Sequence, residues 1–170
     1  MASRNKLTAR DVAYMGVLAA LAVIMAYVEY RIPINIGIPG IKLGLSNIVI
    51  VFTLYFYGPL GAAAVALVKV LVMGLLFGNF ISALYSLAGA ALSLIVMIIL
   101  KKTGKFSCFA VSAAGGMFHN VGQILTAALI LRSASVFYLL PILMAVGELT
   151  GAVIGILAQL VLKRLKPASV

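Results

Sequence analysis

The polar side chains that could do chemistry in this sequence lie inside long apolar runs, and the fifth run carries the densest group. Ser112, Gly116, His119, Gln123 and Thr126 recur every three or four residues, which places them on one face of a helix. Their imidazole, amide and hydroxyl groups are expensive to bury in lipid unless they find hydrogen-bond partners. Two interpretations remain open: the face lines a ligand-binding cavity, which we favour, or it joins neighbouring helices by hydrogen bonds.

Other residues offer little support for catalysis. The single histidine and the lone Cys108 exclude a His-rich or cysteine-based metal site. Only three acids occur, Asp11, Glu29 and Glu148, which nearly excludes paired-carboxylate catalysis. The sequence also lacks a phosphate-binding loop and an aspartate-rich pair that could hold magnesium against a diphosphate. We therefore expect no metal, no cofactor and no enzymatic activity.

Two charged side chains lie within apolar runs. Lys69 falls near the middle of the third run and Glu148 falls within the sixth. A lone charge at mid-bilayer costs at least a few kcal/mol, so either the two pair with each other or Lys69 faces the cavity and binds an anionic ligand. Asn120 points about 100° away from the polar face, so it flanks the cavity or bonds to another helix.

Two further polar residues lie near the ends of apolar runs. Asn79 begins the fourth run and could add hydrogen bonds, and Lys42 could guard the cavity mouth or extend to the membrane interface. The candidate substrate-binding residues are His119, Asn120, Gln123, Lys69, Lys42, Asn79 and Glu148.

The elements that position these residues follow from composition. The 170 residues are 65% hydrophobic and 9% charged, with a mean hydropathy of +1.24, whereas soluble domains carry about 25% charged residues. A membrane-spanning helix needs about 20 apolar residues. We expect an all-α membrane protein whose residues 1–170 form a single six-helix transmembrane bundle, with spans at about 8–30, 43–57, 60–77, 80–100, 106–131 and 136–162.

The basic residues predict how this bundle is oriented. Nine of the 13 flank one side of the six spans: Arg4, Lys6, Arg10, Lys101, Lys102, Lys105, Lys163, Arg164 and Lys166. Three lie in loops on the other side: Arg31, Lys42 and Arg132. Because cytoplasmic loops carry an excess of Lys and Arg, we expect both termini in the cytoplasm.

Small residues form stripes in the first and last spans. Ala9, Ala13, Gly16 and Ala20 follow one helical face, and Ala22 and Ala26 lie on a neighbouring face. In the sixth span, Gly147, Gly151 and Gly155 stand four residues apart. Such stripes let helix backbones approach closely in lipid. They indicate either packing within this bundle or docking of another membrane subunit.

Three motifs resemble a known family. The stretch 39–48, Pro-Gly-Ile-Lys-Leu-Gly-Leu-Ser-Asn-Ile, and the turn 57–61, Tyr-Gly-Pro-Leu-Gly, resemble the substrate-binding S components of energy-coupling factor (ECF) transporters. More narrowly, the stretch 115–123, Gly-Gly-Met-Phe-His-Asn-Val-Gly-Gln, is similar to the Gx transporter family, also called heptaprenyl diphosphate synthase component I. The similarity extends over about 7–165.

The resemblance implies a subunit in the plasma membrane of a prokaryote. It would capture a small micronutrient-like or amphipathic substrate and hand it to a scaffold membrane subunit with two cytoplasmic ATPases. The scaffold would dock on Ala9, Ala13, Gly16, Ala20, Ala22 and Ala26. Two alternatives remain: an accessory membrane subunit of a polyprenyl diphosphate synthase, or an independent secondary carrier, although no inverted repeat is visible.

Overall fold

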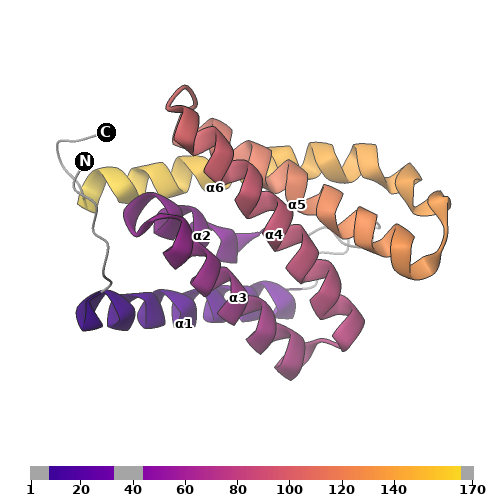
Figure 1. The fold of residues 1–170 in the computed structure, drawn as a ribbon, viewed down its shortest axis with the longest axis horizontal. Coiled ribbons are helices and arrows are strands. Elements are labelled where there is room, and N and C mark those ends of the chain that lie inside the picture. The colour runs from indigo at the N-terminus through magenta and orange to yellow at the C-terminus, as the bar shows by residue number, and fades with distance from the viewer. Residues whose placement is uncertain (1–7, 33–43, 166–170) are drawn as a thin grey trace.

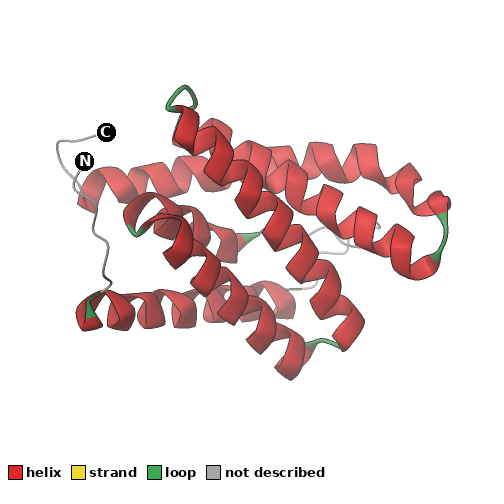
Figure 2. Cartoon of the chain, in the orientation of Figure 1, coloured by secondary structure: helices red, strands yellow, loops and turns green. Residues whose placement is uncertain are grey.

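The computed structural model describes residues 8–32 and 44–165, and within them the chain is helical, with no strand. Figure 1 shows the helices in chain order, and Figure 2 shows the short loops that connect α3 to α4, α4 to α5 and α5 to η1. The elements are α1 (Ala9–Arg31), α2 (Leu45–Phe56), α3 (Gly58–Phe77), α4 (Phe80–Thr103), α5 (Cys108–Leu131), the 3-10 helix η1 (Ala134–Leu139) and α6 (Leu140–Leu165). This confirms the all-α, six-helix prediction.

The helices differ in whether they can cross a membrane. Within the described residues, α1, α3, α4, α5 and the continuous segment of η1 and α6 are long and apolar enough to do so. The 12 residues of α2 extend only about 18 Å, which is less than the ~30 Å of a hydrocarbon core. The chain is therefore a multi-pass membrane protein. Among its described α-helices, α2 is the one that is too short to span the bilayer by itself.

The two ends of the described chain lie at the same end of the bundle. Figure 1 shows the start of α1, in indigo, and the end of α6, in yellow, together at the left, whereas the turn between α5 and α6 lies at the right. Which side of the membrane that end occupies remains a prediction from the basic residues.

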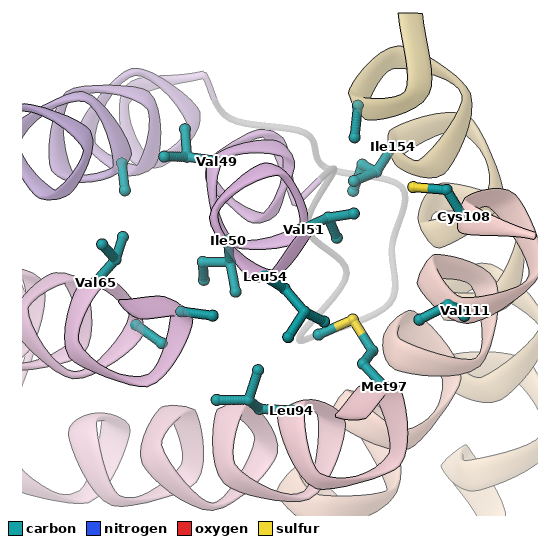
Figure 3. Close-up of a cluster of buried hydrophobic side chains, with 14 of the residues drawn as sticks. Val49, Ile50, Val51, Leu54, Val65, Leu94, Met97, Cys108, Val111 and Ile154 are labelled. Carbon is teal, nitrogen blue, oxygen red and sulfur yellow. The ribbon is translucent and has the colours of Figure 1, made fainter. Parts of the chain in front are cut away.

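The short helix α2 forms the centre of the apolar core. It packs against α1, α3 and α6, and its buried residues are Ser46, Val49, Ile50, Val51, Thr53 and Leu54. Figure 3 shows its side chains among those of α3, α4, α5 and α6. The cluster includes Val49, Ile50, Val51 and Leu54 of α2, Val65 of α3, Leu94 and Met97 of α4, Val111 of α5 and Ile154 of α6.

Polar contacts fix both ends of α2. Gly44, which precedes the helix, has a φ of 73°, a left-handed conformation that suits glycine. At the other end the Lys101 ammonium of α4 donates a hydrogen bond to the Leu54 carbonyl oxygen at 2.6 Å. A cation at a helix C-terminus satisfies one of the last free carbonyl groups and complements the helix dipole.

The glycine stripe of α6 packs within the bundle. A Cβ atom on Gly151 would lie 2.5 Å from the Ser112 carbonyl oxygen, and one on Gly155 would lie 2.8 Å from the Phe109 Cα. Gly147 is similarly tight against Gly116 of α5. The small residues therefore let α5 and α6 touch backbone to backbone, and for this stripe the packing interpretation is confirmed.

The small residues of α1 divide between two environments. Ala9, Ala13, Gly16 and Ala20 are exposed, and a Cβ atom on Gly16 would meet no atom within 4 Å. Ala22, by contrast, is 0% exposed and belongs to the core. The neighbouring face predicted for docking is therefore turned inward, and only the first four residues form an open surface, which we call the α1 stripe.

Candidate functional site

A cavity of about 330 Å³ lies between the helices, and all six α-helices contribute to its walls. A volume of this size holds about 11 waters at ~30 Å³ each, which is at the small end for ligand pockets. Its walls take the C-terminal parts of α1 and α3 and the N-terminal parts of α2 and α6. The polar lining residues are Glu29, Tyr30, Ser46, Asn47, Lys69, Ser82, Ser86, Ser93, Ser112, His119, Asn120, Gln123 and Thr150.

The polar face of α5 lines one wall of this cavity. Ser112, Gly116, His119 and Gln123 all border it, as their helical spacing predicts. Thr126 does not: its hydroxyl donates to the Gly122 carbonyl oxygen of the same helix at 2.9 Å. The cavity therefore follows about three turns of α5 and ends before Thr126.

Some of these polar groups hold helices together. The Ser112 hydroxyl donates to the Gly151 carbonyl oxygen of α6 at 2.7 Å, and the Asn120 amide donates to the Leu143 carbonyl oxygen at 2.6 Å. Ser93 of α4 likewise donates to Gly115 of α5 at 2.7 Å. Asn120 thus both flanks the cavity and bonds to another helix.

Gln123 differs from these residues. Its amide lines the cavity and is half-buried, and no hydrogen bond from it is found to the rest of the described chain. An amide carries two donors and one acceptor oxygen. Gln123 therefore presents hydrogen-bonding capacity that is directed at the cavity and not used by helix packing.

Gly89 of α4 sets the position of the ligand-facing part of α5. A Cβ atom there would lie 2.8 Å from the His119 carbonyl oxygen and 2.9 Å from the Gln123 Cγ atom. The two helices approach this closely only because position 89 has no side chain. His119 and Gln123 are therefore held against the cavity by the backbone of α4.

Lys69 brings a positive charge to the opposite wall. It is 9% exposed, and its ammonium donates to Asn47 Oδ1 at 3.1 Å and to Ser46 Oγ at 3.3 Å. Both acceptors belong to the first turn of α2. Of the described residues that line the cavity, Lys69 is the one cation among Lys and Arg, so this wall favours an anionic group.

Glu29 contributes the carboxylate of the site. It lies on α1, lines the cavity, and accepts a hydrogen bond from the Gly44 N–H at 2.5 Å. A carboxylate at the start of α2 also complements the helix dipole. Three residues of this wall were not among the substrate-binding residues predicted from the sequence: Glu29, Ser46 and Asn47. The sequence feature that could have indicated them is that each is polar and lies within or beside an apolar run.

Two predicted site residues, Asn79 and Glu148, do not join them. Asn79 is exposed and does not line the cavity; its side chain caps α4 by accepting from the Ser82 N–H at 2.7 Å. Glu148 is exposed on α6, also away from the cavity, and in the described chain it forms no ion pair with Lys69. The predicted pairing therefore fails because the two side chains face different ways. Lys42 lies outside the described residues.

The described residues bring together no group of three or more His, Cys, Asp and Glu side chains that could hold a metal ion. The site is thus a set of hydrogen-bonding groups around one ammonium and one carboxylate. Such a set can bind and orient a small polar molecule.

A family model described as heptaprenyl diphosphate synthase component I matches residues 18–161. The matched segment begins within α1 and ends within α6, so it contains every residue that lines the cavity. No curated protein and no solved structure matches the chain.

Proposed function

Since the chain belongs to the heptaprenyl diphosphate synthase component I family, also called the Gx transporter family, we propose that it is a substrate-binding subunit of an ATP-driven importer. It would act as an S component of the ECF type and catalyse no reaction. The observation that carries this proposal is the cavity of about 330 Å³, enclosed by all six helices and lined by polar side chains. A membrane protein buries such groups only where they are used.

The position of the cavity supports capture from outside the cell. It lies in the half of the bundle where α1 ends and α6 begins, away from the two ends of the described chain. With those ends in the cytoplasm, as the basic residues predict, the cavity belongs to the outer half of the membrane. A substrate would enter there and be passed inward by a partner.

The energy for transport must come from other subunits. The sequence has no phosphate-binding loop, so the proposed partners are a scaffold membrane subunit and two cytoplasmic ATPases. The α1 stripe supports this assembly because its four small residues are exposed and open. In lipid, such a surface permits the close backbone approach that holds transmembrane helices together.

The cavity also limits the substrate. A wall with the Lys69 ammonium faces a wall with His119 and Gln123, which suits a small molecule that carries an anionic group and hydrogen-bonding atoms. We therefore propose that a small polar anion binds inside the bundle.

A second candidate function is favoured by the family's description. In it, the chain assists a soluble prenyltransferase as a membrane subunit, without contributing catalytic groups. Co-purification separates the two proposals. The tagged chain, expressed with candidate partners of both kinds, should retain the scaffold and ATPases in detergent. Retention of the prenyltransferase without ATPases would contradict the importer proposal.

A further inference from the structure

Glu148 remains unexplained by the cavity. It lies on α6, is exposed, and has no hydrogen-bonding or ionic partner among residues 8–32 and 44–165. The rise along α6 from Glu148 to Lys163, in the last turn, is about 22 Å, and from Leu140 to Glu148 it is about 12 Å, at ~1.5 Å per residue. Both ends of that stretch must lie near the membrane surfaces, so Glu148 lies at hydrocarbon depth.

The neighbours of Glu148 one turn away on α6 are all non-polar: Met144, Ala145, Gly151 and Ala152. Leu149 is 68% exposed and Val153 is 52% exposed, as expected for side chains that face lipid. A carboxylate on such a surface is unfavourable in lipid, and ionisable residues within spans almost always pair with another polar group. None of the described residues supplies such a group for Glu148.

The described residues of a second copy do not supply that group either. The exposed basic residues of the described chain all lie in loops or at helix ends: Arg10, Arg31, Lys102, Lys105, Arg132, Lys163 and Arg164. The one lysine at hydrocarbon depth, Lys69, is buried and bonded to α2. Within residues 8–32 and 44–165, a copy packed on Glu148 thus presents no exposed cation at the required depth.

The residues beside Glu148 fit a closely packed helix. Ala145 and Ala152 flank it within one turn on the same side of α6, and Gln159 follows on that face farther along the helix. Small residues permit close approach, and a carboxylate with an amide adds polar contacts across the interface. We call Ala145, Glu148, Ala152 and Gln159 the Glu148 surface.

We propose that the Glu148 surface binds a transmembrane helix of a different protein, which carries a lysine or arginine side chain at the depth of Glu148. This surface lies on α6, whereas the α1 stripe lies on α1, and it does not depend on the importer proposal. An importer subunit and a synthase subunit would each use it to recognise a membrane partner.

Photo-crosslinking in native membranes tests this proposal. A photoreactive residue is placed at Ala145 or Ala152, with Val153 as the control position about 100° farther around the helix, and the crosslinked peptide is sequenced. The first two positions should yield a peptide from another membrane protein with Lys or Arg inside an apolar run. Crosslinks to lipid alone, or to a second copy of this chain, overturn the proposal.

Charge exchange completes the test. Glu148→Gln should lower the crosslink yield roughly three- to twentyfold, the range expected for one polar contact within a membrane, while Leu149→Ala should leave it unchanged. Glu148→Lys should abolish the crosslink, and replacing the partner's basic residue by Glu should restore it. A yield that is insensitive to Glu148→Gln, or no recovery in the exchanged pair, overturns the proposal.

Discussion

Gln123 and His119 are the side chains whose removal tests the cavity most simply. Each borders the cavity from α5, and loss of one hydrogen-bonding group leaves its ligand partner unsatisfied, at about 1–3 kcal/mol. Gln123→Ala and His119→Ala should therefore weaken ligand binding about 5- to 150-fold by titration calorimetry. Thr126→Ala is the matched control, because Thr126 bonds within α5. Unchanged affinity in both cavity variants would mean that this face serves packing alone.

Substitution of Lys69 distinguishes an anion-binding role for its ammonium from a structural ion pair with Glu148. Removing one member of a buried, hydrogen-bonded charge pair costs about 2–5 kcal/mol, so Lys69→Met should weaken binding of an anionic ligand by more than tenfold. A neutral ligand analogue should lose much less. Because Glu148 faces away from Lys69, adding Glu148→Gln should restore nothing. Rescue by that second substitution, measured by thermal shift and binding, would reinstate the predicted pair.

The sequence predicted some site residues and not others, for a physical reason. Helical spacing along α5 places His119 and Gln123 on one face, and that information is local. Glu29 and Asn47 reach the cavity only because α1 and α2 lie beside α3, which spacing along one helix cannot reveal. The same limit made the pairing of Lys69 with Glu148 wrong, since depth in the membrane says nothing about direction around a helix.

At the scale of the helices, close packing of α5 on α6 requires glycine. A Cβ atom on Gly151 would lie 2.5 Å from a backbone oxygen, and overpacking of this kind costs about 1–3 kcal/mol. Gly151→Ala should therefore lower the unfolding temperature in detergent, measured by thermal denaturation. Gly16→Ala is the control, since that position is open. Equal stability of the two variants would contradict the packing assigned to α6.

Element boundaries were largely predictable. The predicted span 43–57 compares with α2 at Leu45–Phe56, because the Gly58-Pro59 turn that ends it is visible in sequence. The last span, predicted at 136–162, instead comprises η1 and α6 and continues to Leu165. Pro141 lies in the first turn of α6, where proline is compatible with a helix start. At the other end, the sequence prediction placed Lys163 and Arg164 outside the span, whereas they form the last turn of α6.

At the scale of the whole molecule, the orientation in the membrane can be measured directly. Cysteines can be placed at Thr103, the last residue of α4, and at Ser135, in η1, in a Cys108→Ala background. The α4–α5 and α5–α6 connections next to them lie at opposite ends of the bundle in Figure 1. An impermeant thiol reagent should label Ser135→Cys in intact cells and Thr103→Cys only after the cells are opened. The reverse pattern would place the termini outside and turn the cavity towards the cytoplasm.

The central claim is that this chain binds a substrate and passes it to an ATP-driven module. The most direct measurement is ATP-dependent uptake into vesicles that contain the chain, the scaffold and the ATPases, with the ligand identified by mass spectrometry of the purified protein. Uptake should require ATP, fall in Gln123→Ala through lost binding, and fall in Gly16→Leu with binding intact, because the α1 stripe can no longer dock. Ligand binding without ATP-dependent uptake in the wild-type assembly would contradict the claim.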